Sequence, residues 1–296
     1  HVVREERVQT RLGAGRRRRL PRDAMKDTAS AIRRFLSETN GQRRARVVAV
    51  ATAAVRDAPN SGRLLRPLRA EGVEVRILSG HEEARLGAVA ATWSLPITDA
   101  LIFDLGGGSL QLTRLAGGRI EPLGSLPLGA VRTTRRFFRH DPPTAGEIRS
   151  LRRDTRALLR DLLSPAAGAK ALVGLGGTVR TLARVHLAGA GIDRDSGHGR
   201  RLSRADVSAI RERLELLPSS ERRLRGLKGE RADIILAGAI VVEELMAAGD
   251  HPFLTVCARS VRHGVLIEET FGRDAVRPGL APAPEEALAR SGEMLA

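Results

Sequence analysis

The sequence is poor in cysteine and aromatic residues and has no long apolar run. Cys257 is the one cysteine among 296 residues, which excludes an internal disulfide and fits a reducing cytoplasm. Aromatic residues make up 2% of the chain, with one Trp and no Tyr, so stacking platforms for nucleic-acid bases are not expected. No stretch of about eighteen uncharged apolar residues occurs, so we predict no membrane-spanning helix. The first residues lack the apolar segment of a signal peptide, so none is expected.

Lysine is also scarce, occurring only at Lys26, Lys170 and Lys228, yet the net charge is +16. Almost all of the positive charge therefore comes from arginine. The mutational bias of a GC-rich genome would explain part of this excess. A polyanionic partner, such as polyphosphate, a highly phosphorylated nucleotide or nucleic acid, would explain it functionally, and charge by itself does not choose among the three.

Hydrophobic periodicity predicts a mixed α/β chain. Strands are expected at 73–78, 99–105, 109–116, 119–127 and 253–258, and also within 46–55 and 170–178, where each is followed by a turn. Helices are expected at 23–39, 62–72, 81–93, 129–138, 144–163, 178–188, 204–217, 231–249 and 260–271. Two of these helices begin with capping residues, Thr144 (with Glu147) and Ser203. We predict a first lobe at 1–126 and a second at 127–296, with the last helix a candidate to pack back on the first lobe.

Two glycine-rich turns follow predicted strands, one at 106–109 and one at 174–178. Glycine lets backbone N–H groups approach an anion, and the second turn leads into a predicted helix whose N-terminus adds positive potential. Neither turn ends in the Gly-Lys-Ser/Thr of a P-loop. The alternative to anion binding is that these glycines only form tight turns. Two such turns, one in each lobe, favour a phosphate held between the lobes.

Asp104 ends a buried strand directly before the first glycine turn. A carboxylate beside a phosphate site is electrostatically unfavourable unless a cation such as Mg²⁺ lies between them. The alternative is a turn aspartate that bonds to the amides of its own loop. We favour the metal, because the turn would present anions to it.

Two further segments carry residues suited to phosphate chemistry. Glu83 lies in the first turn of a predicted helix and is not needed for its cap, so it could deprotonate a water that attacks phosphorus. A solvated first-turn acid is the simpler reading of Glu83 alone. Thr52 and Arg56 lie just past a strand end, and arginine binds phosphate oxygens with two hydrogen bonds. In so arginine-rich a chain, any one arginine is more often a surface residue.

Six stretches together resemble one protein family in their order and spacing. They are "ATAAVRDA", "ILSGHEEARLG", "LIFDLGGGSLQL", "LPLGAVRTTRRFF", "VGLGGTVRTLA" and "ERADIILAGAIVVEELM". The chain resembles the exopolyphosphatase / guanosine pentaphosphate phosphohydrolase (Ppx/GppA) family in its short two-domain form, over residues 8–267. The resemblance implies the two-lobed fold of actin, sugar kinases and Hsp70, with ribonuclease H-like lobes. It also implies Mg²⁺-dependent hydrolysis of the terminal phosphate of inorganic polyphosphate or pppGpp.

The resemblance also assigns roles to individual residues. Glu83 matches the catalytic base, with Arg56 as a second catalytic residue, and Asp104 matches a metal-linked carboxylate. Gln111 occupies a metal-site position where the family usually has glutamate, and an amide binds Mg²⁺ more weakly. The matched phosphate-binding residues are Thr52, Gly106, Gly107, Gly108, Ser109, Gly176, Gly177 and Thr178.

Three departures from the family pattern bear on activity. The family opens with a hairpin carrying Asp-x-Gly-Ser-Asn-Ser, and we expect this chain to begin after that hairpin. Gln111 replaces an acid, and "CARSVRHG" keeps only Arg262 and Gly264 of a late motif. The favoured function is an exopolyphosphatase, because the arginine excess suits a long polyanion. The alternative is a catalytically impaired protein that binds polyphosphate or guanosine penta- or tetraphosphate. We expect a cytoplasmic location, no nucleic-acid or membrane partner, and the homodimer often formed by short family members.

Overall fold

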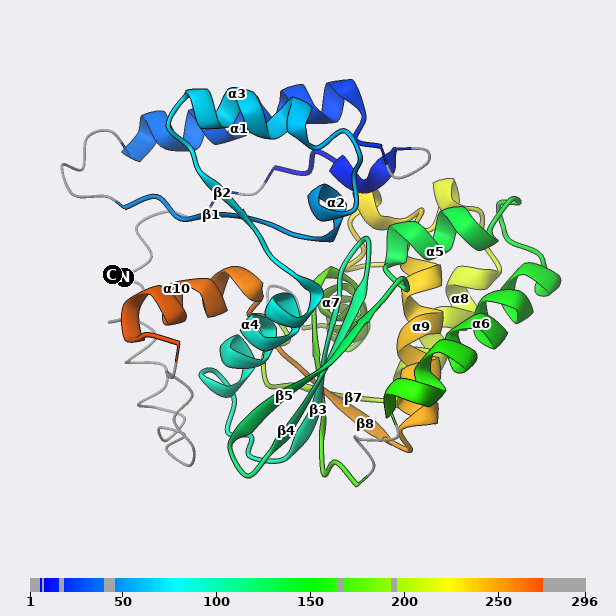
Figure 1. The fold of residues 1–296 in the computed structure, drawn as a ribbon. Coiled ribbons are helices and arrows are strands. Elements are labelled where there is room, and N and C mark those ends of the chain that lie inside the picture. Colours follow the sequence, from blue (N-terminus) through cyan, green and yellow to red (C-terminus); the bar gives the residue numbers. More distant parts are fainter. Residues whose placement is uncertain are drawn as a thin grey trace. The chain divides into compact units, whose positions relative to one another are not determined.

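The computed structural model describes residues 6, 8–15, 19–39, 46–163, 168–192 and 196–273 (Figure 1). Contacts within the chain divide it into two compact units, one ending at Gly80 and one beginning at His81. Each unit is described by itself below. The helix predicted near the end of the tail lies outside the described residues. Among the helices of the described ranges, none is both long and apolar enough to cross a membrane.

In the described residues of unit one, helices α1, α2 and α3 pack around a small apolar core. The elements are η1 (Leu12–Ala14), α1 (Arg22–Thr39), β1 (Ala49–Ala51), α2 (Ala53–Arg56), α3 (Gly62–Ala70) and β2 (Val75–Ile77). The strands pair in parallel, with Ala49 opposite Val75. Leu64 and Leu68 of α3 enter the core, while Pro67 faces solvent, so this proline does not prevent the predicted helix. The strand predicted within 46–55 forms as β1, and helix α2 begins at Ala53 where a turn was expected.

Unit two is built on a mixed six-stranded sheet. Its strands are β3 (Ala100–Leu105), β4 (Leu110–Ala116), β5 (Arg119–Leu126), β6 (Leu172–Leu175), β7 (Arg201–Ser203) and β8 (Phe253–Val256), in the order β5-β4-β3-β6-β8-β7. β3 is antiparallel to β4 but parallel to β6, with Asp104 opposite Leu175. The lobe boundary predicted at 126–127 therefore falls between strands that belong to one sheet.

The two faces of this sheet carry different layers of helix (Figure 1). Leu101, Phe103 and Leu105 of β3 point into a large apolar core with the helices of one layer, whereas Ile102 packs with α4 on the other face. This alternation follows from the two-residue period of a strand. The first layer comprises α5 (Ala130–Phe137), α6 (Ala145–Leu163), α7 (Gly177–Gly189), α8 (Arg204–Glu215) and α9 (Ile235–Ala248); the opposite side carries α4 (Gly80–Thr92) and α10 (Val261–Phe271).

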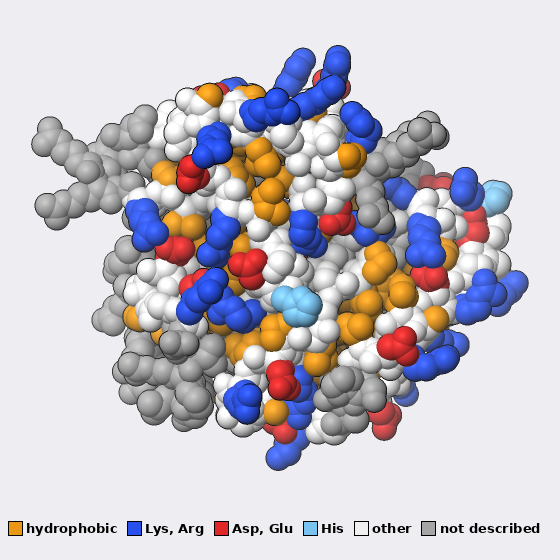
Figure 2. All heavy atoms as spheres, in the orientation of Figure 1, with side chains coloured by type: hydrophobic (Ala, Val, Ile, Leu, Met, Phe, Trp, Pro, Cys, Tyr) orange, Lys and Arg blue, Asp and Glu red, His pale blue; other side chains and the backbone are white. Residues whose placement is uncertain are grey.

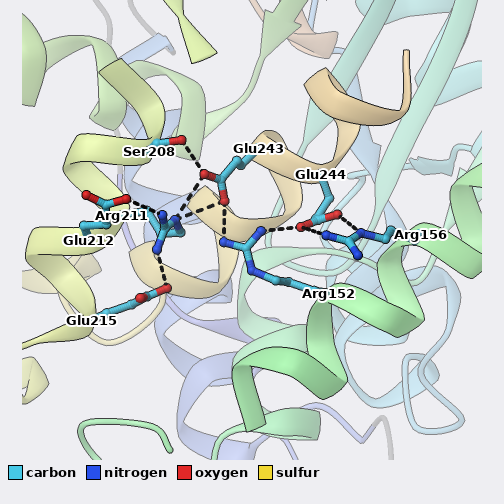
Figure 3. Close-up of polar contacts among 8 residues, drawn as sticks. All are labelled: Arg152, Arg156, Ser208, Arg211, Glu212, Glu215, Glu243 and Glu244. Carbon is cyan, nitrogen blue, oxygen red and sulfur yellow. Dashed lines mark hydrogen bonds and ion pairs between the residues drawn. The ribbon is translucent and has the colours of Figure 1, made fainter. Parts of the chain in front are cut away.

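Two buried glutamates of α9 are held by arginines of the neighbouring helices (Figure 3). Arg152 of α6 reaches both: its Nη2 lies 2.5 Å from Glu243 Oε2, and its Nη1 donates to Glu244. Arg211 of α8 places its Nε 3.0 Å from Glu243. Burial alone would raise the pKa of Glu243, but the Ser208 hydroxyl and these two arginines hold that pKa below its usual value. The cluster fixes α9, which is otherwise apolar and buried, between α6 and α8.

Candidate active site

Asp104 lies at the end of β3, on the sheet face covered by α4. It is partly buried, and its carboxylate accepts no hydrogen bond from any residue the structure describes. Burial raises the pKa of the Asp104 carboxyl to about 6, and the positive charge of Arg180 opposes that rise. Because no hydrogen-bond donor stabilises its charged form, a cation beside the carboxylate would favour ionised Asp104 further.

Two glycines lie beside this carboxylate, and one of them must be glycine to leave room for it. A methyl group at Gly176 would lie 2.7 Å from Asp104 Oδ1 and 2.4 Å from the carbonyl oxygen of Leu105. Gly176 also has φ of 98°, a left-handed conformation that favours glycine. On the α4 side, a methyl group at Gly87 would come within 3.9 Å of Asp104 Oδ2. The Asp104 carboxylate therefore sits between the start of α7 and the backbone of α4.

Gln111 stands directly opposite Asp104 in the β3–β4 pair and is buried. Its Nε2 donates to the hydroxyl of Ser109 at 2.6 Å and to the hydroxyl of Ser125 at 3.2 Å. The nitrogen end of the amide is therefore directed at the two serines. The structure thus brings Asp104, Ser109 and Gln111 together at one end of two adjacent strands.

The first glycine turn is anchored to the start of α5. The carbonyls of Gly106 and Gly107 accept hydrogen bonds from the backbone N–H groups of Ala130 and Val131, each at 3.0 Å. Gly129 is required for this contact, because a methyl group there would lie 2.3 Å from the backbone of the turn. The first N–H groups of α5 are therefore capped by the turn itself.

The N–H groups of Gly107 and Gly108 take no part in this contact with α5. Within the described part of the chain, the N–H groups of Gly107 and Gly108 have no backbone acceptor. The backbone at 106–108 stays outside the left-handed region, so positive φ is not the reason for these glycines. Steric room is a better reason at Gly107, where a methyl group would lie 3.3 Å from Val131 Cγ2. The turn can present backbone donors to an anion.

The second glycine turn ends at the N-terminus of α7, where a positive side chain joins it. Gly176 is the N-cap, and Thr178 is buried. A methyl group at Gly177 would lie 2.2 Å from Nη2 of Arg231, so this guanidinium rests against the first residue of the helix. The helix end and the guanidinium both favour an anion. Sequence reasoning did not single out Arg231, although the motif "ERADIILAG" contains it, because nothing local distinguishes it from the other arginines.

Glu83 lies in the first turn of α4 and is buried, with 4% of its surface exposed. The next residue, Ala84, accepts a hydrogen bond from the Thr113 hydroxyl at 3.1 Å, which ties this turn to β4. Further along α4, Arg85 pairs with Glu268 of α10. The helix that carries Glu83 is therefore fixed on the face of the sheet that carries Asp104.

Thr52 and Arg56 belong to unit one. The carbonyl of Thr52 accepts the N–H groups of Val55 and Arg56 at the start of α2. Arg56 Nη1 donates to the carbonyl of Leu78 at 2.7 Å, and its Nε lies 3.5 Å from Asp57. Their assignment as phosphate-contacting residues stays a prediction from the family motif.

Comparisons with known proteins agree on one family. A model of the Ppx/GppA phosphatase family matches residues 1–271. The chain belongs to this family. Exopolyphosphatase 1 of Mycobacterium leprae (strain TN) is 34% identical over 238 residues, which cover 76% of this chain and 68% of that protein. Exopolyphosphatase 2 of Mycobacterium tuberculosis (strain ATCC 25618 / H37Rv) is 32% identical over 259 residues, covering 83% and 81%.

Solved structures give the same result. The crystal structure of the Aquifex aeolicus member of the Ppx/GppA family shares 30% identity, with a TM-score of 0.75 and coverage of 88% of this chain and 86% of that one. The chain is therefore a Ppx/GppA-type phosphatase, a hydrolase, and the α/β fold of this family, expected from the sequence, is confirmed. Hydrolysis of pppGpp, a homodimer and a cytoplasmic location stay predictions.

The Asp104 carboxylate fits the oxygen ligands that a divalent cation such as Mg²⁺ prefers. Among the described residues, no three His, Cys, Asp or Glu side chains gather as a metal cluster. Mg²⁺ in phosphoryl-transfer sites often takes one or two protein carboxylates and completes its shell with water and phosphate oxygens. Asp104, an ionisable carboxylate without hydrogen-bond donors, matches that requirement.

Proposed function

We propose that this phosphatase hydrolyses the terminal phosphoanhydride bond of inorganic polyphosphate. The observation that carries the proposal is the position of Asp104, a carboxylate that accepts no hydrogen bond from the described residues, beside glycine turns at the ends of β3 and β6. The names of the relatives support the choice of substrate, since both Mycobacterium proteins are exopolyphosphatases. A polyanion also suits the net charge of +16, whose arginines and lysines are scattered over the face shown in Figure 2.

The terminal phosphate is held by groups from the two turns in this proposal. The amides of Gly107 and Gly108 donate to its oxygens from one side. The N-terminus of α7, with Gly177 and Thr178, receives it from the other. Arg231 supplies a charge-assisted contact at the same helix end, and Ser109 adds a hydroxyl.

Asp104 would hold Mg²⁺, with Gln111 as a second and weaker ligand through Oε1. A bound Mg²⁺ would neutralise negative charge on the phosphate oxygens and favour ionised Asp104. A carboxyl with a pKa of about 6 is mostly ionised at neutral pH, so the chain can offer the charged ligand there. The serine hydroxyls that occupy Gln111 Nε2 leave its carbonyl oxygen as the group able to face a cation.

Glu83 is the proposed general base. Its carboxylate accepts a proton from water as the water oxygen bonds to the terminal phosphorus. The bond from that phosphorus to the bridging oxygen breaks, and the shortened chain leaves with the electron pair. The products are orthophosphate and a polyphosphate shorter by one unit. Donors already in place at the turns would stabilise the charge that develops on the transferred group.

The test measures orthophosphate release from long-chain polyphosphate and from pppGpp, each with and without Mg²⁺. We expect Mg²⁺-dependent release from polyphosphate. Release of orthophosphate from pppGpp but not from polyphosphate would show that the substrate is the guanosine nucleotide. Tight binding of polyphosphate without release would favour the second candidate, a non-hydrolytic binding protein, which Gln111 in place of an acid supports.

A further inference from the structure

Arg222 is buried in the connection between α8 and α9, with 2% of its side chain exposed. Its Nε donates to the carbonyls of Leu214 and Leu217, both at 3.1 Å. Its Nη1 donates to the carbonyl of Ala232 at 2.8 Å. One guanidinium therefore joins the end of α8 to the segment that enters α9.

This burial is unfavourable for the arginine itself. Burial lowers the pKa of Arg222, although the negative charges of Asp141 and Asp233 oppose that effect. Its Nη2 is buried and has no hydrogen-bond acceptor among the described residues; the nearest Asp141 oxygen is 3.7 Å away. An apolar side chain would fill the same space without this penalty. The three carbonyl contacts are what an apolar residue could not provide.

The contact from Arg222 to the Ala232 carbonyl involves the residue that follows Arg231 in the chain. Arg231 closes the short 3-10 turn η5 (Gly229–Arg231), in which its N–H donates to Lys228 at 2.9 Å. The N–H of Ala232 donates to Gly229 at 3.1 Å, so both sides of Ala232 are fixed. The Ala232 N–H thus fixes the peptide that follows Arg231, and Arg222 fixes the next peptide through the Ala232 carbonyl.

We propose that Arg222 is a positioning residue that acts through Arg231. It fixes the 229–232 backbone so that the Arg231 guanidinium stays against Gly177, at the phosphate-binding end of α7. The proposal rests on the function proposed above, because it assigns Arg231 to phosphate contact. Asp141 supports Arg222 by its charge and is itself fixed by the Ser219 backbone and hydroxyl.

Arg222→Lys tests the proposal. Lysine keeps the positive charge but lacks the planar guanidinium, whose separate nitrogens donate to carbonyls of both α8 and the segment before α9. We expect kcat/KM for polyphosphate to fall about tenfold, the order expected for a displaced charge-assisted contact. The matched control is Arg223→Lys. Arg223 is the exposed neighbour, and we expect kcat/KM within twofold of wild type.

The deciding measurement is a double-mutant cycle with Arg231→Ala. If Arg222 acts through Arg231, then adding Arg222→Lys to Arg231→Ala leaves kcat/KM unchanged within twofold. A purely structural role would lower kcat/KM by the same factor in both backgrounds, and that result would overturn the proposal. Asp141→Asn serves as the second variant if Arg222→Lys does not fold, with the same dependence on Arg231 expected.

Amide hydrogen exchange gives a readout that does not require activity. We expect the N–H groups of Arg231, Ala232 and Ile234 to exchange faster in Arg222→Lys while the strands of the sheet keep their protection. Unchanged exchange at these amides would overturn the positioning role. If wild type neither hydrolyses nor binds polyphosphate but the exchange changes as expected, the proposed function fails and the role of Arg222 in placing Arg231 stands.

Discussion

Asp104 and Gln111 face each other across the β3–β4 pair, an acid opposite an amide. Residues opposite each other in an antiparallel pair have Cβ atoms about 5 Å apart, so a change at one is felt at the other. The amide nitrogen of Gln111 is taken by Ser109 and Ser125, which leaves Asp104 without a donor from that side. The pair therefore brings one ionisable group, and not two, to this end of the strands.

Gln111→Glu should tighten Mg²⁺ binding. A second carboxylate opposite Asp104 adds a charged oxygen ligand, and affinity for Mg²⁺ rises with ligand charge. We expect the dissociation constant for Mg²⁺, measured by calorimetry without substrate, to fall about tenfold, and the Mg²⁺ concentration needed for activity to fall with it. Ser125→Ala is the control: it removes one partner of the amide without adding charge, so Mg²⁺ affinity should not rise. An unchanged dissociation constant in Gln111→Glu would remove this position from the metal site.

Asp104→Asn should stabilise the protein at high pH while abolishing activity. The folded-state pKa of Asp104, about 6, lies above its ordinary 3.8, so ionisation of Asp104 is less favourable in the folded chain than in the unfolded chain. Wild-type stability therefore falls as pH rises from about 4 to about 6, by up to about 3 kcal/mol. The variant lacks this loss. Urea unfolding without Mg²⁺ should show it more stable than wild type at pH 8 and equal at pH 4.

Asp99→Asn is the control, because it should change stability at pH 8 in the opposite direction. A hydrogen bond from Arg114 lowers the pKa of Asp99, despite partial burial, so its ionised form stabilises the folded state above the ordinary carboxyl pKa. Removing that charge should lower stability at pH 8, with little effect on activity. If both aspartate variants change stability in the same direction at pH 8, the electrostatic account of Asp104 is wrong.

Glu83→Gln should separate binding from chemistry. The amide keeps the shape of the side chain but cannot accept a proton from water, so we expect kcat to fall about 10²- to 10⁴-fold. Affinity for polyphosphate, measured by calorimetry, should stay within a few-fold of wild type. Glu82→Gln, one residue earlier on the same helix turn, should leave kcat near the wild-type value. Equal losses in the two variants would assign Glu83 a structural role.

Gly129→Ala should damage the first glycine turn. A methyl group there would lie 2.3 Å from the backbone at Gly108 and Ser109, which cannot yield as a flexible side chain would. We expect a loss of about 1–3 kcal/mol in unfolding free energy and a fall in kcat/KM. Gly189→Ala, at the end of α7 with no atom within 4 Å of the new methyl group, should be neutral or stabilising by up to about 1 kcal/mol. Full activity in Gly129→Ala would show that the turn need not rest on α5.

Glu244→Gln should lower stability without affecting the site. Glu244 is buried and binds both Arg152 and Arg156, so a neutral amide weakens two charge-assisted contacts of a buried side chain (Figure 3). Arg152 keeps its contact with Glu243, so we expect a loss of about 1.5–3 kcal/mol in chemical unfolding, with KM for polyphosphate unchanged. Glu212→Gln removes an exposed partner of Arg211 and should change stability by about 0.5 kcal/mol or less. Similar losses in both variants would contradict the view that burial makes this cluster important.

Local features were predictable from sequence because their signals are local. Thr144 and Glu147 form the reciprocal hydrogen bonds of a capping box, and Ser203 caps α8, as expected. Contacts between distant parts of the sequence were not predictable. The pairing of β3 with β6 joins residues about seventy positions apart, and no periodic pattern in the sequence indicates it. Arg231 and Arg222 were missed for a similar reason, since their importance depends on Gly177 and on the carbonyls they meet only in the folded chain.

The pairing of β3 with β6 also has a mechanical consequence. Neighbouring strands lie about 4.8 Å apart, and backbone hydrogen bonds maintain that spacing. The turns that follow the two strands are therefore held at a separation that side-chain changes cannot easily alter. In the proposed reaction, release of orthophosphate would therefore not involve separation of these two turns.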